Sequence, residues 1–306
     1  MKLTPAAIRS LKAEGFLHNR GSESFSARII PMGGSISAEQ TIAIGEAARL
    51  FGGSQVCFTS RMTVELPHIP YEQIGAFKQH IGEAGLATGG TGARVRPVTS
   101  CKGSTCVFGL YDTNALNLAI HNRFYEGYRS VPLPHKFKIG VGGCPNNCIK
   151  ADLNDFGIVG QRVPLLDSAR CKGCTLCNAQ KGCPMQAINR MESELPSIDE
   201  SICNNCGRCI KGCPFGAIIG EEIRFKVFLG GRWGKQIRIG TPLSPLFSEE
   251  EVLSLIEKSL LLFIEEGSQG ERFASVIERL GMQEVEGRLL GNDLLLRKGS
   301  ILTHVS

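Results

Sequence analysis

The sequence predicts an α+β fold that is interrupted by a short cysteine-rich insert. Helix and strand signals alternate in short segments on both sides of the insert, which favours mixed layers. Hydrophobic residues make up 42% and charged residues 21% of the 306 positions, which excludes a disordered or fibrous chain. Eight of the 13 cysteines fall between residues 165 and 220. We therefore expect an ordinary globular core and a separate unit organised around cysteine.

The first 90 residues show a regular order of helices and strands. Thr4 and Pro5 are typical of a helix start, Gly15 of a helix end, and Ser37 of a second helix start. The expected segments are a helix over 4–15, a strand over 23–30, a helix over 37–51, strands over 55–59 and 62–66, and a helix over 71–84. This order suits a small α+β layer of ferredoxin-like topology.

The rest of the chain repeats this mixture around the insert. The expected segments are a helix near 114–125, a strand over 222–229, helices over 248–266 and 271–280, and short strands in the tail. Ser248 and Glu251 form the capping-box pattern of a helix start. We expect residues 1–90 to form the ferredoxin-like half. Residues 91–164 and 221–306 then form one discontinuous domain, into which residues 165–220 are inserted.

Charge and hydropathy exclude several classes of protein. The formal net charge of +5 is too small to indicate nucleic-acid binding. No stretch approaches the ~20 apolar residues of a membrane span. The start, MKLTPAAIRSLKAEG, has no apolar signal-peptide segment, so we expect a cytoplasmic protein. In that compartment, 13 cysteines indicate metal binding more than disulfides.

The insert carries two cysteine triplets, each associated with a Cys-Pro pair. This is the bacterial two-cluster ferredoxin pattern, in which the remote fourth cysteine of each run binds the other [4Fe-4S] cluster. The first cluster then takes Cys171, Cys174, Cys177 and Cys213, and the second takes Cys183, Cys203, Cys206 and Cys209. Five residues separate Cys177 from Cys183 where the pattern has three, which lengthens a loop. Zinc is the alternative, because zinc ribbons also use C-x2-C pairs.

Four further cysteines form two separated pairs, Cys101-x4-Cys106 and Cys144-x3-Cys148. Four thiolates in this arrangement bind a third cubane, although on spacing alone a zinc site is nearly as good. The remaining cysteine, Cys57, lies in a strand pattern, and we expect it to be buried as a small apolar residue.

Three segments resemble the sirohaem and cluster domain of sulfite and nitrite reductases: RPVTSCKGSTC, LPHKFKIGVGGCPNNC and ADLNDFGIVG. The resemblance spans about residues 15 to 300. Within the family, the chain is similar to the small dissimilatory and anaerobic sulfite reductase subunits that carry a ferredoxin insert. One departure is that the first cysteine pair has four intervening residues, where the family usually has five. The resemblance implies sirohaem besides three [4Fe-4S] clusters, with Cys148 bridging a cluster to the sirohaem iron.

The resemblance also assigns roles to basic residues. Lys136 and Lys138 alternate in an extended segment and so face the same way. In the family this pair points at the substrate, which implies anion binding and proton donation. Arg61 and Arg96 match substrate-binding arginines, while Arg28, Arg94 and Arg232 are weaker candidates for the sirohaem carboxylates. His135, Lys150 and Arg162 are further candidates, each of which has an ordinary surface role as its alternative.

The implied function is the six-electron reduction of sulfite to sulfide, with electrons relayed through the insert. The alternatives are nitrite reduction to ammonia, another substrate on the same fold, or a non-catalytic electron carrier. GGRWGK at 230–235 lacks phosphate-loop spacing and GGTGAR at 89–94 lacks the context of a dinucleotide fingerprint. An external donor or partner subunit must therefore supply the electrons. Longer family members contain two such repeats, so we expect a homodimer or hetero-oligomer.

Overall fold

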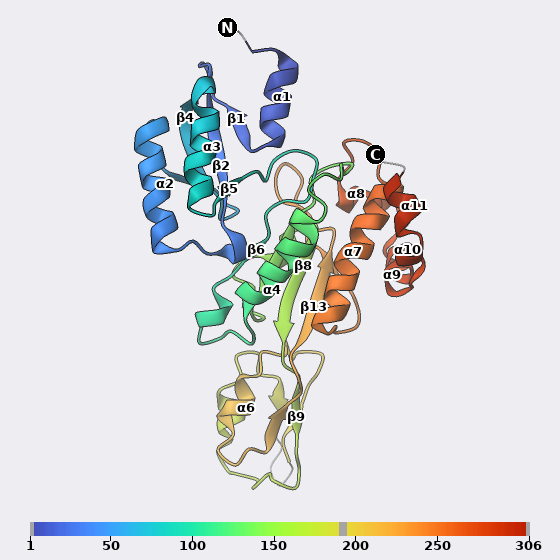
Figure 1. The fold of residues 1–306 in the computed structure, drawn as a ribbon. Coiled ribbons are helices and arrows are strands. Elements are labelled where there is room, and N and C mark those ends of the chain that lie inside the picture. Colours follow the sequence, from blue (N-terminus) through green and yellow to red (C-terminus); the bar gives the residue numbers. More distant parts are fainter. Residues whose placement is uncertain (1–2, 190–194, 304–306) are drawn as a thin grey trace.

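The computed structural model describes residues 3–189 and 195–303. It is an elongated mixed helix-and-strand molecule with an N-terminal layer at one end, a central sheet and the cysteine-rich insert at the other end (Figure 1). The helix-and-strand class that the sequence predicts is confirmed.

The N-terminal layer is an antiparallel sheet covered by helices on one side (Figure 1). The helix α1 (Pro5–Ala13) begins at Thr4, whose hydroxyl accepts from the N–H of Ala7 as a helix cap. The strands run in the order β1-β2-β4-β3, with β5 paired to β2. The bounds are β1 (Phe16–His18), β2 (Ser24–Ile30), β3 (Cys57–Phe58), β4 (Val64–Pro70), β5 (Ala87–Thr88), α2 (Ala38–Phe51) and α3 (Ile74–Glu83). The apolar faces of α2, α3 and the sheet form one core, which includes Phe25, Leu66 and Phe77.

The central sheet has five strands in the order β14-β13-β8-β7-β6. The bounds are β6 (Thr99–Ser100), β7 (Ile139–Gly142), β8 (Phe156–Gln161), β13 (Arg224–Leu229) and β14 (Thr241–Pro242). The pairs β6–β7 and β7–β8 are parallel, and β13 runs antiparallel to β8. The helices α4 (Thr113–Ile120), its π-helical continuation (His121–Glu126) and α7 (Glu249–Glu266) belong to the large core that covers this sheet.

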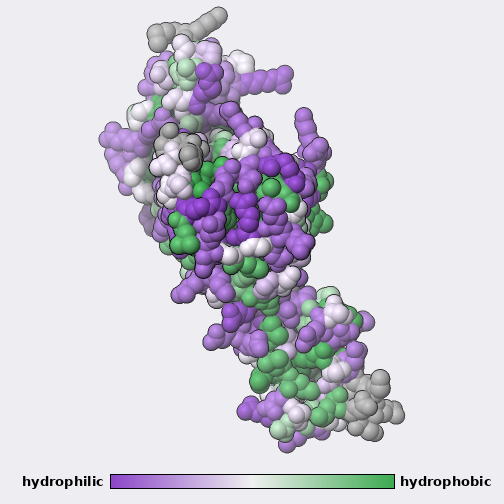
Figure 2. All heavy atoms as spheres, turned by 90° about the vertical axis from the view of Figure 1, so that its right-hand side faces the viewer, coloured by the Kyte–Doolittle hydropathy of each residue, from purple (hydrophilic) through white to green (hydrophobic). Residues whose placement is uncertain are grey.

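The insert continues directly from two neighbouring strands of the central sheet. After β8 the chain enters β9 (Pro164–Leu166), and it returns through β12 (Ile218–Gly220) into β13; β9 and β12 are themselves paired. Between them lie α5 (Asn178–Lys181), β10 (Ile188–Asn189), β11 (Ser197–Ile198) and α6 (Arg208–Gly212). Its apolar core is small, and side chains such as Leu176, Ile202 and Phe215 remain exposed on the insert. Figure 2 shows apolar side chains gathered at this end of the molecule.

Two sequence expectations about the fold are wrong. The helix α8 (Phe273–Leu280) agrees with the expected helix over 271–280, but the tail after it consists of helices α9 (Met282–Leu290), α10 (Asp293–Leu296) and α11 (Lys298–Thr303) rather than strands. Apolar residues in these short segments, such as Val285 and Leu289, pack into the same core as α7, so packing favours the helical form. Cys57 is exposed rather than buried, because the expected strand over 55–59 is a two-residue edge strand.

Across the described ranges, every helix is either too short or too polar to pass through a lipid bilayer.

Candidate functional site

Between the N-terminal layer and the central sheet lies a cavity that we call the basic cavity, with an empty volume of about 680 Å³. It brings together five of the basic residues that the sequence singles out: Arg28, Arg61, Arg96, Lys136 and Lys138. The other residues that line it are Thr59, Ser60, Thr63, Gly90 and Pro97. No carboxylate stands among these lining residues, so the cavity has a strong excess of positive charge.

The two lysines face the basic cavity because of the buried residue between them. Phe137 is fully buried in the central core and forms a parallel bridge with Val95. Its neighbours Lys136 and Lys138 therefore point to the opposite side. They directly precede β7 rather than lying inside a regular strand, because only Phe137 pairs there with the neighbouring chain segment.

Arg61 is held at the cavity by partners that are distant in sequence. Its Nη1 donates to Asn154 Oδ1 at 2.7 Å and its Nη2 donates to the Pro97 carbonyl at 2.9 Å. Asn154 in turn donates to the Lys150 carbonyl at 3.1 Å, which ties Arg61 to the loop that follows Cys148. The Arg61 Nε is buried and has no hydrogen-bond partner among the described residues. A buried guanidinium with an unused donor is suited to bind an anion.

The Gly90 peptide group positions the other two arginines. Its carbonyl accepts from Nη1 of Arg28 at 3.0 Å and from Nη1 of Arg96, while its N–H donates to Tyr125 Oη at 3.0 Å. Gly90 has a φ of 73°, and a Cβ there would lie 2.6 Å from Cγ of Pro97, so glycine is required. Tyr125 belongs to the π-helical segment. Sequence reasoning missed Tyr125, because nothing in the local pattern links it to a loop 35 residues earlier.

Burial and mutual repulsion shift the pKa values in the basic cavity. Burial, together with the neighbouring Arg61, lowers the pKa of Lys138 to about 8, although Asp155 opposes the shift. Burial also lowers the pKa values of Arg61 and Arg96 to about 10, and nearby arginines add to the effect. Both arginines therefore stay charged at neutral pH, whereas Lys138 is close to losing its proton.

Asp155 is the buried acid behind this cluster of positive charge. It is fully buried, its carboxylate accepts from Nη2 of Arg272 at 2.9 and 3.2 Å, and it accepts from the backbone N–H of Lys138 at 3.0 Å. Burial raises the pKa of Asp155, and the Arg272 guanidinium opposes that shift. Sequence reasoning missed Asp155 and Arg272, because their pairing joins positions 117 residues apart.

Several basic candidates lie outside the lining of the basic cavity. Arg94 donates to the Arg129 carbonyl. Arg232 donates to Ser275 Oγ at 3.2 Å and lies 3.8 Å from Glu278. The ring of His135 accepts from the backbone N–H of Lys136 at 2.7 Å. A cofactor-binding role for Arg94 and Arg232 stays a prediction.

One set of four cysteines, the sheet quartet, lies at the ends of β6 and β7. Its members are Cys101, Cys106, Cys144 and Cys148. The N–H of Gly143 donates to Cys101 Sγ at 3.1 Å. Burial raises the pKa of the Cys144 thiol, and the electrostatic influence of the other three cysteines adds to the shift, so the four are neighbours. Cys148 alone of this quartet is exposed.

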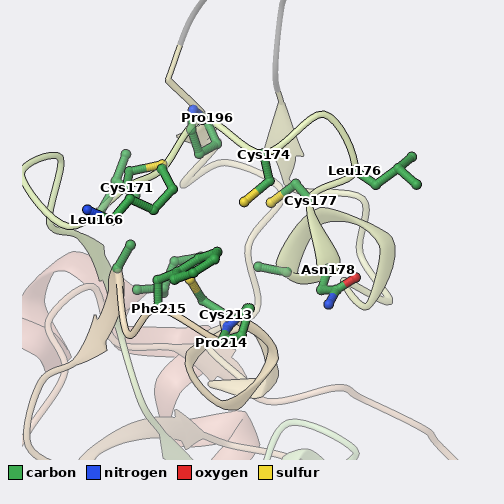
Figure 3. A pocket seen from close by; sticks show the side chains of 15 residues that line it. Leu166, Cys171, Cys174, Leu176, Cys177, Asn178, Pro196, Cys213, Pro214 and Phe215 are labelled. Carbon is green, nitrogen blue, oxygen red and sulfur yellow. The ribbon is translucent and has the colours of Figure 1, made fainter.

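The insert holds the other two quartets. Cys171, Cys174, Cys177 and Cys213 line one cavity, and Figure 3 shows these four side chains around a common space. We call this the first insert quartet. The second insert quartet comprises Cys183, Cys203, Cys206 and Cys209. Burial raises the pKa of the Cys209 thiol to about 11, and the other three members add to this shift. Each quartet thus joins three cysteines from one run with a fourth from the other, as the spacing predicts.

The choice between cubanes and zinc concerns the same twelve cysteines. Within residues 3–189 and 195–303, no three His, Cys, Asp or Glu side chains are close enough to hold one metal ion. A structural zinc ion needs four ligands at about 2.0–2.3 Å from one centre. In a [4Fe-4S] cubane each thiolate binds a different iron, so the sulfurs stand further apart. The all-thiolate donor sets and the two-cluster sequence spacing of the insert therefore favour cubanes over zinc.

Comparisons with known families match both parts of the fold. Residues 91–291 match the model described as "Nitrite and sulphite reductase 4Fe-4S domain", and residues 18–84 match "Nitrite/Sulfite reductase ferredoxin-like half domain". The second match includes Arg28 and Arg61, and the first includes all three quartets.

Individual proteins show the same likeness. The chain is 32% identical to the coenzyme F420-dependent sulfite reductase of Methanocaldococcus jannaschii, over 74% of this chain and 36% of that protein. It is 27% identical to the alpha subunit of the dissimilatory-type sulfite reductase of Allochromatium vinosum, over 67% of this chain and 54% of that subunit. The crystal structure of dissimilatory sulfite reductase I has a similar fold, with a TM-score of 0.71 and 24% identity over 87% of this chain and 68% of that chain. The chain thus spans about a third to a half of the length of these two curated relatives.

Proposed function

Because the chain belongs to the nitrite and sulphite reductase family, we propose that it reduces sulfite to sulfide with sirohaem and three [4Fe-4S] clusters. The observation that carries the proposal is the basic cavity, where five cations converge with no lining carboxylate. Such a cavity suits a small oxyanion that must be held while it gains electrons and protons. Reduction of nitrite to ammonia is the alternative, since both anions place negative oxygens against the same cations.

The residues present fit the proposed cofactors. Twelve cysteines form the three quartets, and the unpartnered Nε atoms of Arg61 and Arg96 leave donors free for an anionic group. Arg28 stands at the rim for a sirohaem carboxylate, although its ion pair with Glu65 at 2.8 Å already uses one edge of its guanidinium. Cys148 is the exposed member of the sheet quartet, and it would hold the sirohaem iron as well as the cluster. When bound, sirohaem supplies an iron centre that binds the oxyanion and passes electrons to it.

In the basic cavity, the arginines bind the anion and the lysines supply protons. Arg61 and Arg96 keep their charge and bind the anion through planar forks of N–H donors. Lys138 holds a proton at Nζ with a pKa lowered to about 8, so it gives that proton readily to an oxygen that leaves as water. Lys136 faces the same cavity and adds a second mobile proton donor. Asn154 and Gly90 keep the arginines in place.

Electron supply and assembly are part of the same proposal. The insert, residues 165–220, takes electrons from an external donor or a partner subunit, and its exposed apolar side chains suit such docking. One of the similar proteins is named as a subunit, which supports an assembly larger than one chain, either a homodimer or a hetero-oligomer. None of the 13 cysteines, all of which lie in the described residues, forms a disulfide, which suits the reducing cytoplasm.

Anaerobically purified protein tests the proposed function. We expect about twelve cluster irons per chain, a sirohaem absorption spectrum and turnover of sulfite with an artificial reductant. Faster turnover of nitrite than of sulfite would establish the alternative substrate. Clusters without a sirohaem chromophore would identify an electron carrier and overturn the reductase proposal.

Replacing Cys148 by serine is expected to remove the magnetic coupling between sirohaem and the sheet-quartet cluster. A serine oxygen is a poor replacement for a thiolate that two iron centres share. The insert quartets lie elsewhere, so their EPR signals are expected to persist. EPR of the reduced protein measures both, with Cys57→Ser as the matched control at an exposed cysteine. Retention of the coupling in Cys148→Ser would show that another residue is the bridge.

Affinity for the oxyanion is expected to fall as the pH rises through about 8. Lys138 is charged below its pKa of about 8 and neutral above it, whereas Arg61 and Arg96 remain charged to about 10. The KM for sulfite, measured between about pH 6 and 10, should therefore rise above pH 8. Lys138→Arg keeps the charge at all these values and should remove the transition. A wild-type KM that is constant across pH 8 would contradict this role.

A further inference from the structure

A second cavity lies where the insert meets the central sheet, and we call it the junction cavity. Its empty volume is about 790 Å³, and it is lined by cysteines of two different quartets: Cys144 of the sheet quartet and Cys206 of the second insert quartet. No cysteine of the first insert quartet lines it. The second insert quartet is therefore the one that faces the sheet quartet across this cavity.

The charged side chains of the junction cavity are all positive. Arg162, Arg208 and Lys211 line it, and no carboxylate does. Arg208 is exposed and lies over the ring of Phe108 at 5.4 Å. The position of Arg162 is different, because it directly follows β8 and is the first residue on the way into the insert.

The backbone fixes Arg162 against the second insert quartet. Its N–H donates to the Asn205 carbonyl at 2.8 Å, and it forms a parallel bridge with Cys206. Two glycines make room for its side chain: a Cβ at Gly220 would lie 2.4 Å from Arg162 Nε, and a Cβ at Gly207 would lie 3.3 Å from Arg162 Cβ. The Arg162 Nε is buried and has no hydrogen-bond partner among the described residues.

No acidic side chain among the described residues pairs with the Arg162 guanidinium. Within the described residues Arg162 forms no ion pair, and its Nε lacks a hydrogen-bond partner. Arg162 as a whole is only partly buried, and a partly buried charge without an ion pair favours an anion close to it. Oxidised four-thiolate cubanes carry about −2, and their net charge and surroundings set their potentials. The two quartets on either side of the junction cavity would supply that anionic charge.

We propose that the second-insert-quartet cluster, by its position across the junction cavity, is the donor to the sheet-quartet cluster, and that Arg162 is the fixed cation that raises the reduction potential of this donor cluster so that it is loaded with electrons. The inference rests on the proposed function for the presence of clusters. In the transfer, one electron leaves the reduced insert cluster, which is oxidised by one unit, and enters the sheet cluster, which is reduced by one unit. A nearby positive charge stabilises the more negative, reduced form of a cluster, so it favours loading of the second insert cluster.

EPR-monitored potentiometry of the holoprotein tests the role of Arg162. In Arg162→Gln we expect reduction of one cluster to become about tenfold less favourable, which for a one-electron couple is a fall of about 59 mV. Arg162→Lys keeps the charge and is expected to restore most of the potential. Lys235→Gln removes an exposed cation outside the insert and is expected to leave all potentials unchanged.

Three results would overturn the inference. Unchanged potentials in Arg162→Gln would show that Arg162 has a packing role only. An equal fall in Arg162→Gln and Arg162→Lys would show that shape rather than charge matters. If Arg162→Gln loses a cluster, Arg162→Met keeps the unbranched stem, and an unchanged potential there would reject the proposal. Absence of cluster iron in the wild-type protein would overturn the proposed function itself, whereas intact clusters with unshifted potentials would reject only the role of Arg162.

Discussion

Replacing Lys138 by methionine is expected to lower kcat/KM for the oxyanion by about 10²–10³-fold, the usual cost of losing one preorganised charge or proton donor. Methionine keeps the length of the stem but removes both the positive charge and the proton at Nζ. The pKa of Lys138 is lowered to about 8, so this side chain donates a proton more readily than an ordinary lysine. Steady-state kinetics with an artificial reductant measure the effect on both kcat and KM.

The matched control is Lys78→Met on α3, since Lys78 is a partly exposed lysine that pairs with Glu14 at 2.9 Å. It is expected to keep the wild-type kcat/KM. A fall in kcat as well as a rise in KM is expected for Lys138→Met, because the residue both binds the anion and supplies protons. Less than a threefold change in kcat/KM would remove Lys138 from the proposed mechanism.

Replacing Asp155 by asparagine is expected to lower the free energy of unfolding by about 3–5 kcal/mol, the cost of leaving one partner of a buried ion pair uncompensated. Asparagine has the same shape but no charge, so Arg272 is left buried next to a neutral amide. The carboxylate also accepts from the backbone N–H of Lys138 at 3.0 Å. The substitution is therefore expected to disturb the basic cavity as well as the core.

Denaturant unfolding of the anaerobic holoprotein measures this cost. Asp293→Asn is the matched control, because Asp293 forms an exposed pair with Arg297 at 2.6 Å and is expected to change stability little. Equal stability of the Asp155→Asn variant and the wild-type protein would show that the buried pair contributes no net stabilisation.

The grouping of the insert cysteines illustrates what sequence alone predicts well, while their role as ligands stays a prediction. The spacing of the two runs in the insert predicts that Cys213 joins the first triplet and Cys183 the second, because a cubane needs four corners and each run supplies three close ones. The structure brings both quartets together in this arrangement. Local signals also predict α2 and α7, since Ser37 and Ser248 each form a capping box.

The partners that hold the basic residues in place follow no local pattern. Arg61 donates a hydrogen bond to Asn154, which is 93 positions away in sequence, and Arg272 donates to Asp155, which is 117 positions away. Such pairings depend on how the N-terminal layer and the central sheet meet, which no short window of sequence encodes. The helices that follow α8 were not predicted for a related reason. Their segments are short and marginal alone, and contacts with the α7 core decide their conformation.

The strands that carry the insert give the molecule a modular topology. Gln161 at the end of β8 pairs with Arg224 at the start of β13, so the chain leaves and re-enters the central sheet at neighbouring points, about 4.7–4.9 Å apart. The whole insert is therefore a single excursion at the tip of a β-hairpin, and a two-residue turn could close the hairpin without it. The insert, which we propose to be an electron relay, can be gained or lost at such a point without rearranging the sheet that supports the basic cavity.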